Sequence, residues 1–148
     1  MTDPVILVVE DNPDHREMIV AALAESCDVS RILAVADGVE ALDYLLGRGP
    51  HAPRDVRKQP RLVVLDMKLA RVHGVEVLRA LRDDPLTQGL PVVMLSSSTE
   101  KEALDSCYAA GANSVVRKSM DHQDLRRKMK HVYEFWVTVN ESNRNSRV

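Results

Sequence analysis

Short apolar runs alternate along this chain with segments that have the spacing of amphipathic helices. This alternation constrains the fold more than any other feature of the sequence. Three runs, at residues 5–9, 62–65 and 92–95, are apolar throughout and rich in β-branched residues. Such runs are typical of strands buried on both faces of a parallel sheet. Weaker strand candidates lie at residues 30–35 and 114–116.

The segments between these runs predict five helices. Asn12 is a suitable N-cap for the first, with Pro13 at its first position. Gly47 and Gly111 follow the second and fourth helices and favour their termination there. The expected helices span residues 13–25, 38–46, 74–81, 100–110 and 121–136. Five β–α units with right-handed crossovers predict a doubly wound α/β fold of the flavodoxin-like (βα)5 type, with a parallel five-stranded sheet of order 2-1-3-4-5.

Length and composition favour one globular domain. The chain has 148 residues, 45% hydrophobic and 28% charged, with a net charge of -2. The near balance of charge and the 3% aromatic content argue against nucleic-acid binding. We expect a domain over residues 1–140, a polar tail at 141–148, no separate output domain and no membrane segment. Cys27, in the segment that ends the first expected helix, and Cys107, in the fourth, lack metal-ligand spacing and predict reduced thiols in the cytoplasm.

Acidic residues follow two strands that should be neighbours. Glu10 and Asp11 come directly after the first strand, and Asp66 follows the third. Because the carboxyl ends of parallel strands meet at one edge, these three carboxylates should converge at the point where the strand order reverses. Like charges at that distance need a counterion, and Mg²⁺ prefers carboxylate oxygens. The sequence therefore predicts a magnesium site.

Groups that suit a phosphoryl oxygen follow the remaining strands at the same edge. Ser96 begins a run of hydroxyl residues that ends at Thr99, and Lys118 follows the fifth strand. A hydroxyl donor and a mobile ammonium beside a carboxylate–metal site are appropriate for phosphoryl transfer.

These motifs resemble the receiver domain of bacterial two-component response regulators over about residues 5–136. The matching segments read ILVVEDNP, LVVLDMKLARVHGVEVL, LPVVMLSSS and AGANSVVRKS. The resemblance implies that Asp66 accepts a phosphoryl group from a sensor histidine kinase. It further implies that Glu10, Asp11, Asp66 and the Lys68 carbonyl hold Mg²⁺, while Ser96 and Lys118 contact the phosphoryl group. The biological role would be that of a switch and not of an enzyme.

A narrower resemblance is to single-domain regulators of phytochrome-type kinases. It depends on the long connector at residues 48–60, on SSSTEKEALDSCYAAGAN and on the ending HVYEFWVTVN. We expect the connector to be a solvated loop at the edge opposite the site.

Several positions depart from the receiver pattern. Ser119 stands where proline usually follows the lysine, which leaves open whether the Lys118–Ser119 bond is cis or trans. Val115 replaces an aromatic residue that usually reports activation. Ala70 and His73 replace proline and aspartate, which predicts a less rigid loop after Asp66. The side chain of Lys68 is expected to tune the lifetime of the phosphoryl group.

The last helix suggests how the protein contacts partners. Leu125, Met129 and Val132 continue into Trp136 and Val139 at heptad-like spacing. We expect the first three to pack on the sheet, and an exposed Trp136 with Val139 to form a homodimer interface. The basic run at 126–131 is interpreted as a solvated face. A histidine phosphotransfer protein is a further possible partner.

Two other interpretations remain open. A phosphatase with an aspartyl-phosphate intermediate usually has a second aspartate where this chain has Lys68. A degenerate receiver that acts only as a scaffold is consistent with Ser119 and Val115, but the full set of acidic, hydroxyl and lysine residues speaks against it.

Overall fold

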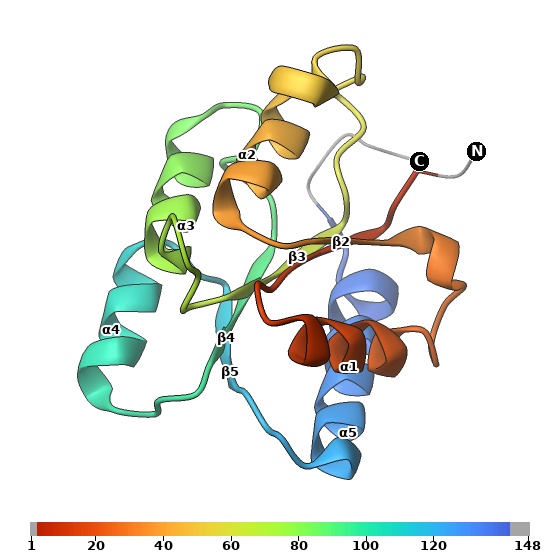
Figure 1. Ribbon diagram of the computed structural model, residues 1–148, viewed down its shortest axis with the longest axis vertical. Coiled ribbons are helices and arrows are strands. Elements are labelled where there is room, and N and C mark those ends of the chain that lie inside the picture. Colours follow the sequence, from red (N-terminus) through yellow and green to blue (C-terminus); the bar gives the residue numbers. More distant parts are fainter. Residues whose placement is uncertain (1–2, 143–148) are drawn as a thin grey trace.

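A computed structural model describes residues 3–142 and shows a parallel five-stranded sheet covered by helices on both faces (Figure 1). The strand order is β2-β1-β3-β4-β5, as predicted. The strands are β1 (Ile6–Val9), β2 (Ile32–Val35), β3 (Leu62–Asp66), β4 (Val92–Ser96) and β5 (Ser114–Arg117). The flavodoxin-like doubly wound fold is therefore confirmed.

The helices divide between the two faces of the sheet. They are α1 (Pro13–Leu23), α2 (Gly38–Leu46), α3 (Gly74–Asp83), α4 (Lys101–Ala109) and α5 (His122–Tyr133). Helices α1 and α5 lie side by side on one face, and α2, α3 and α4 cover the other (Figure 1). This arrangement explains why the central strands are apolar throughout, because both of their faces meet helices.

Strand β1 shows how one run of residues serves two cores. Leu7 and Val9 join the core beneath α2, α3 and α4. Ile6 and Val8 join the core beneath α1 and α5. Side chains alternate between the faces of a strand, so each residue contributes to one core only.

The strand register brings the ends of β1 and β3 together. Val9 pairs with Leu65, so the residues that follow, Glu10 and Asp66, emerge side by side at the carboxyl edge. Asn12 then caps α1 by accepting hydrogen bonds from the amides of Asp14 and His15, as its residue type predicted. The site thus begins directly where two buried strands end.

Some element boundaries differ from those predicted. Helix α1 ends at Leu23, so Cys27 lies in a bend after the helix and is half-buried, whereas Cys107 lies in α4 as expected and is buried. Residues 29–31 form a short 3-10 helix capped by Asp28, and β2 begins only at Ile32. The Asp28 carboxylate accepts a hydrogen bond from the Ser30 amide, and this local contact favours a turn over a strand.

The C-terminal helix also differs from the prediction. Helix α5 ends at Tyr133 and continues as a π-helix over Glu134–Val139. Leu125, Met129 and Val132 pack on the sheet as expected. The expectation of an exposed Trp136 was wrong: its ring is half-buried against the same core, because the wider π turn rotates it away from solvent. Val139 remains 63% exposed.

Most of the connector at residues 48–60 is exposed, as expected of a solvated loop, but several contacts hold it against α2 (at the top of Figure 1). It contains a 3-10 helix, Gly49–His51, and the guanidinium of Arg54 stacks 4.1 Å from the centre of the Tyr44 ring. The buried amide of Gln59 donates to the carbonyls of Leu45 and Val56. The connector is thereby fastened to α2 while its basic side chains Arg48, Arg57 and Lys58 stay exposed.

Among residues 3–142, no helix is long and apolar enough to cross a membrane.

Candidate functional site at the carboxyl edge

Three carboxylates from two strand ends form the centre of the site. Glu10 and Asp11 follow β1, and Asp66 is the last residue of β3. One carboxylate oxygen of each residue lies within 4.8 Å of those of the other two. Glu10 and Asp66 are buried, and Asp11 is half-buried. The convergence predicted from the sequence is present in the structure.

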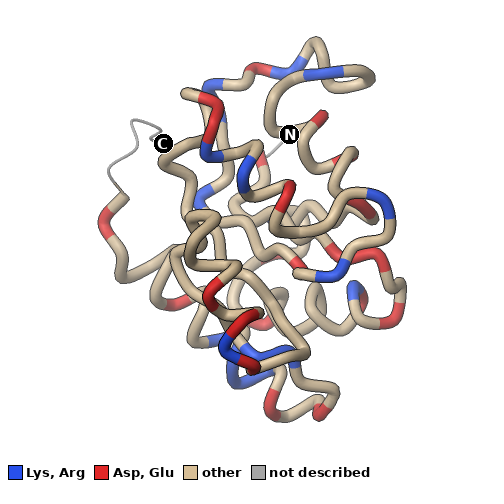
Figure 2. Tube along the Cα trace, turned by 90° about the vertical axis from the view of Figure 1, so that its left-hand side faces the viewer, with Lys and Arg blue, Asp and Glu red and all other residues tan. Residues whose placement is uncertain are grey.

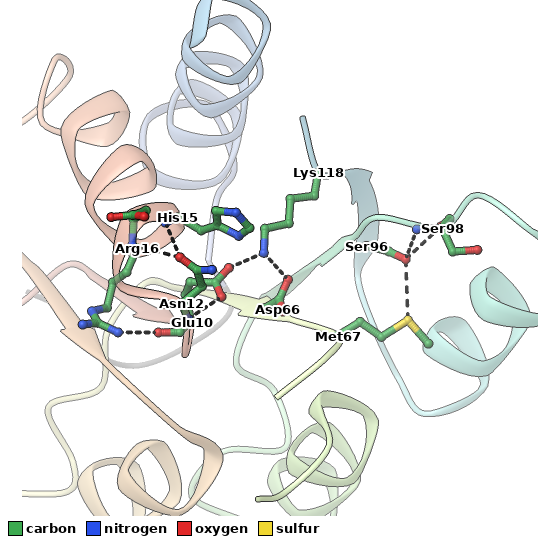
Figure 3. Close-up of polar contacts among 10 residues, drawn as sticks. Glu10, Asn12, His15, Arg16, Asp66, Met67, Ser96, Ser98 and Lys118 are labelled. Atoms are coloured by element: carbon green, nitrogen blue, oxygen red, sulfur yellow. Dashed lines mark hydrogen bonds and ion pairs between the residues drawn. The ribbon is translucent and has the colours of Figure 1, made fainter. Parts of the chain in front are cut away.

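Lys118 is the cation at this cluster (Figure 3). Its Nζ lies 2.5 Å from Glu10 Oε1 and 3.1 Å from Asp66 Oδ1. The Lys118 amide donates to the carbonyl of Ser96, which fixes the main chain beyond β5 against β4. Among the described residues every peptide bond is trans, so the bond between Lys118 and Ser119 is trans. The missing proline has not displaced the lysine from the carboxylates.

Two groups of α1 and its cap hold Glu10 in position. The amide of Asn12 donates to Glu10 Oε2 at 3.1 Å, and Arg16 Nη1 donates to the Glu10 carbonyl at 2.9 Å (Figure 3). His15 lies on the same turn, and its buried Nδ1 has no hydrogen-bond partner. The sequence identified Asn12 as a cap but missed Arg16, because an arginine one turn into a helix is common on solvent-facing surfaces.

Burial and charge shift the proton equilibria of the site. Burial, together with the nearby charge of Glu10, raises the pKa of Asp66 to about 6, against the lowering effect of Lys118. Burial alone would lower the pKa of Lys118, but its hydrogen bonds and charge interactions with Glu10 and Asp66 raise it overall. Three carboxylates around one ammonium leave excess negative charge that a further cation would neutralise.

Ser96 lies at the end of β4, beside β3, but its hydroxyl does not contact the carboxylates. Ser96 Oγ donates to the carbonyl of Ser98 at 2.8 Å and lies 3.6 Å from Met67 Sδ (Figure 3). Met67 Sδ in turn contacts Cys107 Sγ of α4 at 3.9 Å. The structure therefore brings Glu10, Asp11, Asp66 and Lys118 together and leaves Ser96 adjacent to them with its hydroxyl engaged elsewhere.

Val115, which stands where the family usually has an aromatic residue, contacts an aromatic side chain of another element. The amide of Val115 donates to the hydroxyl of Tyr108, which reaches β5 from α4. An aromatic side chain therefore lies against this part of β5 although it comes from a different element. Sequence reasoning missed this contact because only the fold brings the two residues together.

The loop after Asp66 is closed tightly at its base. The Gly74 amide donates to the carbonyl of Met67 at 3.0 Å. A Cβ at position 74 would collide with the Asp66 carbonyl oxygen and lie 2.9 Å from Met67 Cα. Glycine is required here by close approach of the backbone.

The donor set fits a hard divalent cation. Three carboxylates in one buried cluster offer only oxygen ligands, which Mg²⁺ prefers, and Mg²⁺ commonly keeps several waters beside one or two such groups. The structure also shows that Lys118 contacts two of these three carboxylates.

Much of the predicted basic run on α5 is neutralised within the chain. Arg126 pairs with Glu25 of the segment after α1, and Arg127 and Lys128 pair with Asp124. Lysines and arginines are interspersed with acidic residues along the trace (Figure 2). This pattern supports the interpretation of that run as a solvated face.

A parallel (βα)5 fold with an acidic cluster and a lysine at its carboxyl edge defines a phosphoacceptor domain of the two-component type. The sequence matches the family model of the response regulator receiver domain over residues 6–130, and the chain belongs to this family.

Individual members of the family resemble this chain over nearly its whole length. The probable methanogenesis regulatory protein FilR2 of Methanothrix harundinacea is 37% identical, over 95% of this chain and 88% of its own length. The response regulator Rcp1 of Synechocystis is 28% identical, over 90% of this chain and 88% of its own. The phosphorylated cyanobacterial phytochrome response regulator RcpA superposes with a TM-score of 0.86 at 32% identity, covering 96% of this chain and 99% of RcpA. The resemblance to phytochrome response regulators is therefore confirmed.

Proposed function

We propose that this protein accepts a phosphoryl group on Asp66 from a sensor histidine kinase and signals through protein contacts. The observation that carries the proposal is the ion-paired cluster of Glu10, Asp11, Asp66 and Lys118 at the carboxyl edge. Phosphorylation of RcpA, and the Mn²⁺-bound form of Rcp1, which superposes with a TM-score of 0.82 at 25% identity, support the same chemistry here.

In the proposed reaction, a carboxylate oxygen of Asp66 attacks the phosphorus of a phosphohistidine. The new O–P bond forms as the P–N bond breaks, and the released imidazole nitrogen takes up a proton. Glu10, Asp11, the Asp66 carboxylate and the Lys68 carbonyl would hold Mg²⁺, which when bound screens the repulsion between carboxylate and phosphate. Burial of Asp66 excludes bulk water from the nucleophile.

Lys118 and Ser96 receive the transferred group in this proposal. Lys118 already contacts Asp66 and would pair with the added negative charge. Ser96 would exchange its hydrogen bond with the Ser98 carbonyl for one with a phosphoryl oxygen. That exchange would alter the segment between β4 and α4, which gives the switch a route to the surface. The side chain of Lys68, exposed beside the site, would modify the rate of dephosphorylation.

The partners follow from the relatives and from the exposed C-terminal segment. RcpA is a phytochrome response regulator, so a phytochrome-type kinase is the proposed donor. Phe135 and Val139 remain 49% and 63% exposed on the π-helical segment, which supports a homodimer that uses Val139 together with Phe135, whose ring packs on half-buried Trp136. Onward transfer to a histidine phosphotransfer protein is part of the same proposal. We place the receiver at residues 1–140; of the polar tail at 141–148, residues 143–148 lie outside the described part.

The experiment that tests the proposal is intact-protein mass spectrometry after incubation with acetyl phosphate and Mg²⁺. The expected result is one phosphoryl adduct that requires Mg²⁺ and disappears in Asp66→Asn. A Thr99→Ala variant, which removes an exposed hydroxyl from the same loop, serves as the matched control and should form the adduct. A folded wild-type protein without an adduct would favour the scaffold interpretation instead. Rapid release of phosphate without a detectable adduct would favour a phosphatase.

A further inference from the structure

The loop between β3 and α3, residues 67–73, has few internal constraints although it follows the nucleophile directly. Its sequence contains no proline. Within the described part of the chain, the backbone amides of residues 69–73 donate no hydrogen bond to a backbone carbonyl. Leu69 is buried in the core and Val72 packs partly against it. The Lys68 amide bonds to the Asp66 carboxylate, but the exposed residues beyond it, Ala70 and Arg71, need another restraint to hold one conformation.

An ion pair supplies such a restraint. Arg71 Nη2 lies 2.6 Å from Asp37 Oδ2, and this contact joins the loop to the start of α2 across 34 residues of sequence. The side chain of Asp37 is only 22% exposed, whereas that of Arg71 is 63% exposed. The arginine therefore reaches from solvent onto a largely covered carboxylate.

The partner of Arg71 is itself rigidly held. Asp37 is the N-cap of α2 and accepts from the Glu40 amide at 2.8 Å, while the Glu40 carboxylate accepts from the Ala36 amide at 3.2 Å. The two bonds resemble a capping box, except that the glutamate accepts from the amide before the N-cap residue. The loop backbone also approaches the same helix turn closely, because a Cβ at Gly38 would lie 3.1 Å from the Val72 carbonyl oxygen. Arg71 is thus anchored on a fixed point.

We propose that Arg71 and Asp37 are positioning residues for the metal site: their ion pair holds loop 67–73 in the conformation that presents the Lys68 carbonyl beside Asp66. The inference rests on the proposed function, since it concerns the same cation. Without the pair, the loop samples more conformations. The apparent affinity for the cation then falls in proportion to the fraction of molecules whose loop is in the binding conformation.

Substitutions can separate this role from simple electrostatics. Arg71→Gln removes a positive charge, and Asp37→Asn removes a negative charge while retaining a good N-cap residue. Through-space charge alone would make the first variant bind a cation more tightly and the second more weakly. Loss of the positioning contact makes both variants bind more weakly, and the double variant no weaker than either single one.

The experiment titrates wild type and these variants with Mn²⁺, followed by the EPR signal of the free ion, at low and high salt. We expect each single variant to weaken binding by about two- to fivefold at low salt, as for a partly exposed ion pair, with partial rescue in Arg71→Lys. The difference should shrink at high salt. Arg126→Gln, which breaks the remote pair with Glu25, should bind as wild type does.

Hydrogen exchange of the metal-free proteins gives a second measurement. The Gly74 amide, which closes the loop by donating to the Met67 carbonyl, should exchange faster in both single variants and remain unchanged in Arg126→Gln. Equal Mn²⁺ affinities and equal exchange in wild type and variants would overturn the positioning role while leaving the metal site intact. Mn²⁺ binding by wild type that is undiminished in Asp11→Asn and Asp66→Asn would instead overturn the proposed metal site itself.

Discussion

The two ends of the sheet bury polar groups in opposite ways. At the amino end, the guanidinium of Arg82 in α3 donates to the carbonyls of Gln88, Leu90 and Gly111 and to the side chain of Asn113, with distances of 2.7–3.1 Å. We call these contacts the Arg82 network. At the carboxyl end, Lys118 faces Glu10 and Asp66, with Asp11 beside them.

The difference lies in what surrounds each cation. The four acceptors of the Arg82 network are neutral carbonyl and amide oxygens, whose hydrogen-bonding capacity does not change between pH 5 and 8. The carboxyl end surrounds a charge with other charges, and burial with repulsion raises the pKa of Asp66 to about 6. The first arrangement fastens loops together. The second retains excess negative charge, which is the condition for attracting a cation.

The largest expected effect comes from breaking the Arg82 network. Arg82→Ala should lower the free energy of unfolding by about 3 kcal/mol, because several partly buried carbonyls lose a charged donor at once. Urea denaturation measures this loss. Arg79→Ala, at an exposed position of the same helix, should change stability by less than about 0.5 kcal/mol. Equal stabilities of the two variants would show that the network is not structural.

A smaller effect of opposite sign is expected at the carboxyl end. The raised pKa of Asp66 means that the folded state binds this proton more tightly than the unfolded state between about pH 4 and 6. The free energy of unfolding therefore falls as the pH rises through this window. Without metal, Asp66→Asn should be more stable than wild type by about 1–3 kcal/mol at pH 7.5.

The pH dependence identifies the cause of that gain. The difference between Asp66→Asn and wild type should vanish as the pH falls toward 4, since both side chains are then neutral. Denaturation curves at several pH values, with a chelator present, provide the measurement. A gain that is constant with pH would mean that packing, and not charge, distinguishes the variant.

The smallest expected effect is that of removing a neutral hydrogen bond at the amino end of the sheet. Thr87 is buried at the amino end and donates from Oγ1 to the Leu81 carbonyl at 2.7 Å. Thr87→Val keeps the shape and should cost about 1 kcal/mol, with no change between pH 5 and 8 because no titrating group is involved. The same denaturation series checks this. If the cost of Thr87→Val changed clearly with pH, a titrating group would have to take part in this contact, contrary to the hydrogen bond described.

The fold and the acidic cluster could be predicted because both depend on order along the chain. Apolar runs gave the strands, and the residues directly after β1 and β3 had to meet once the strand order was known. Lys118 followed in the same way from β5. Glu10, Asp11, Asp66 and Lys118 therefore needed no knowledge of side-chain conformation.

Contacts between side chains distant in sequence could not be predicted in this way. The partners of Arg71, Arg82 and Ser96 depend on rotamers and loop paths that leave no periodic signal. Trp136 was misplaced for a related reason: a heptad spacing assumes a continuous α-helix, and the π-helix over Glu134–Val139 changes which side chains share a face.

The contact between Tyr108 and β5 has a consequence for how molecules of this protein associate. Strand β5 ends the sheet, and an open strand edge is a template on which another chain can add a strand and start aggregation. By accepting the hydrogen bond of the Val115 amide, the Tyr108 hydroxyl occupies one outward donor of a strand only four residues long. The tyrosine of α4 thus leaves one donor fewer on this edge for pairing with a strand of another molecule.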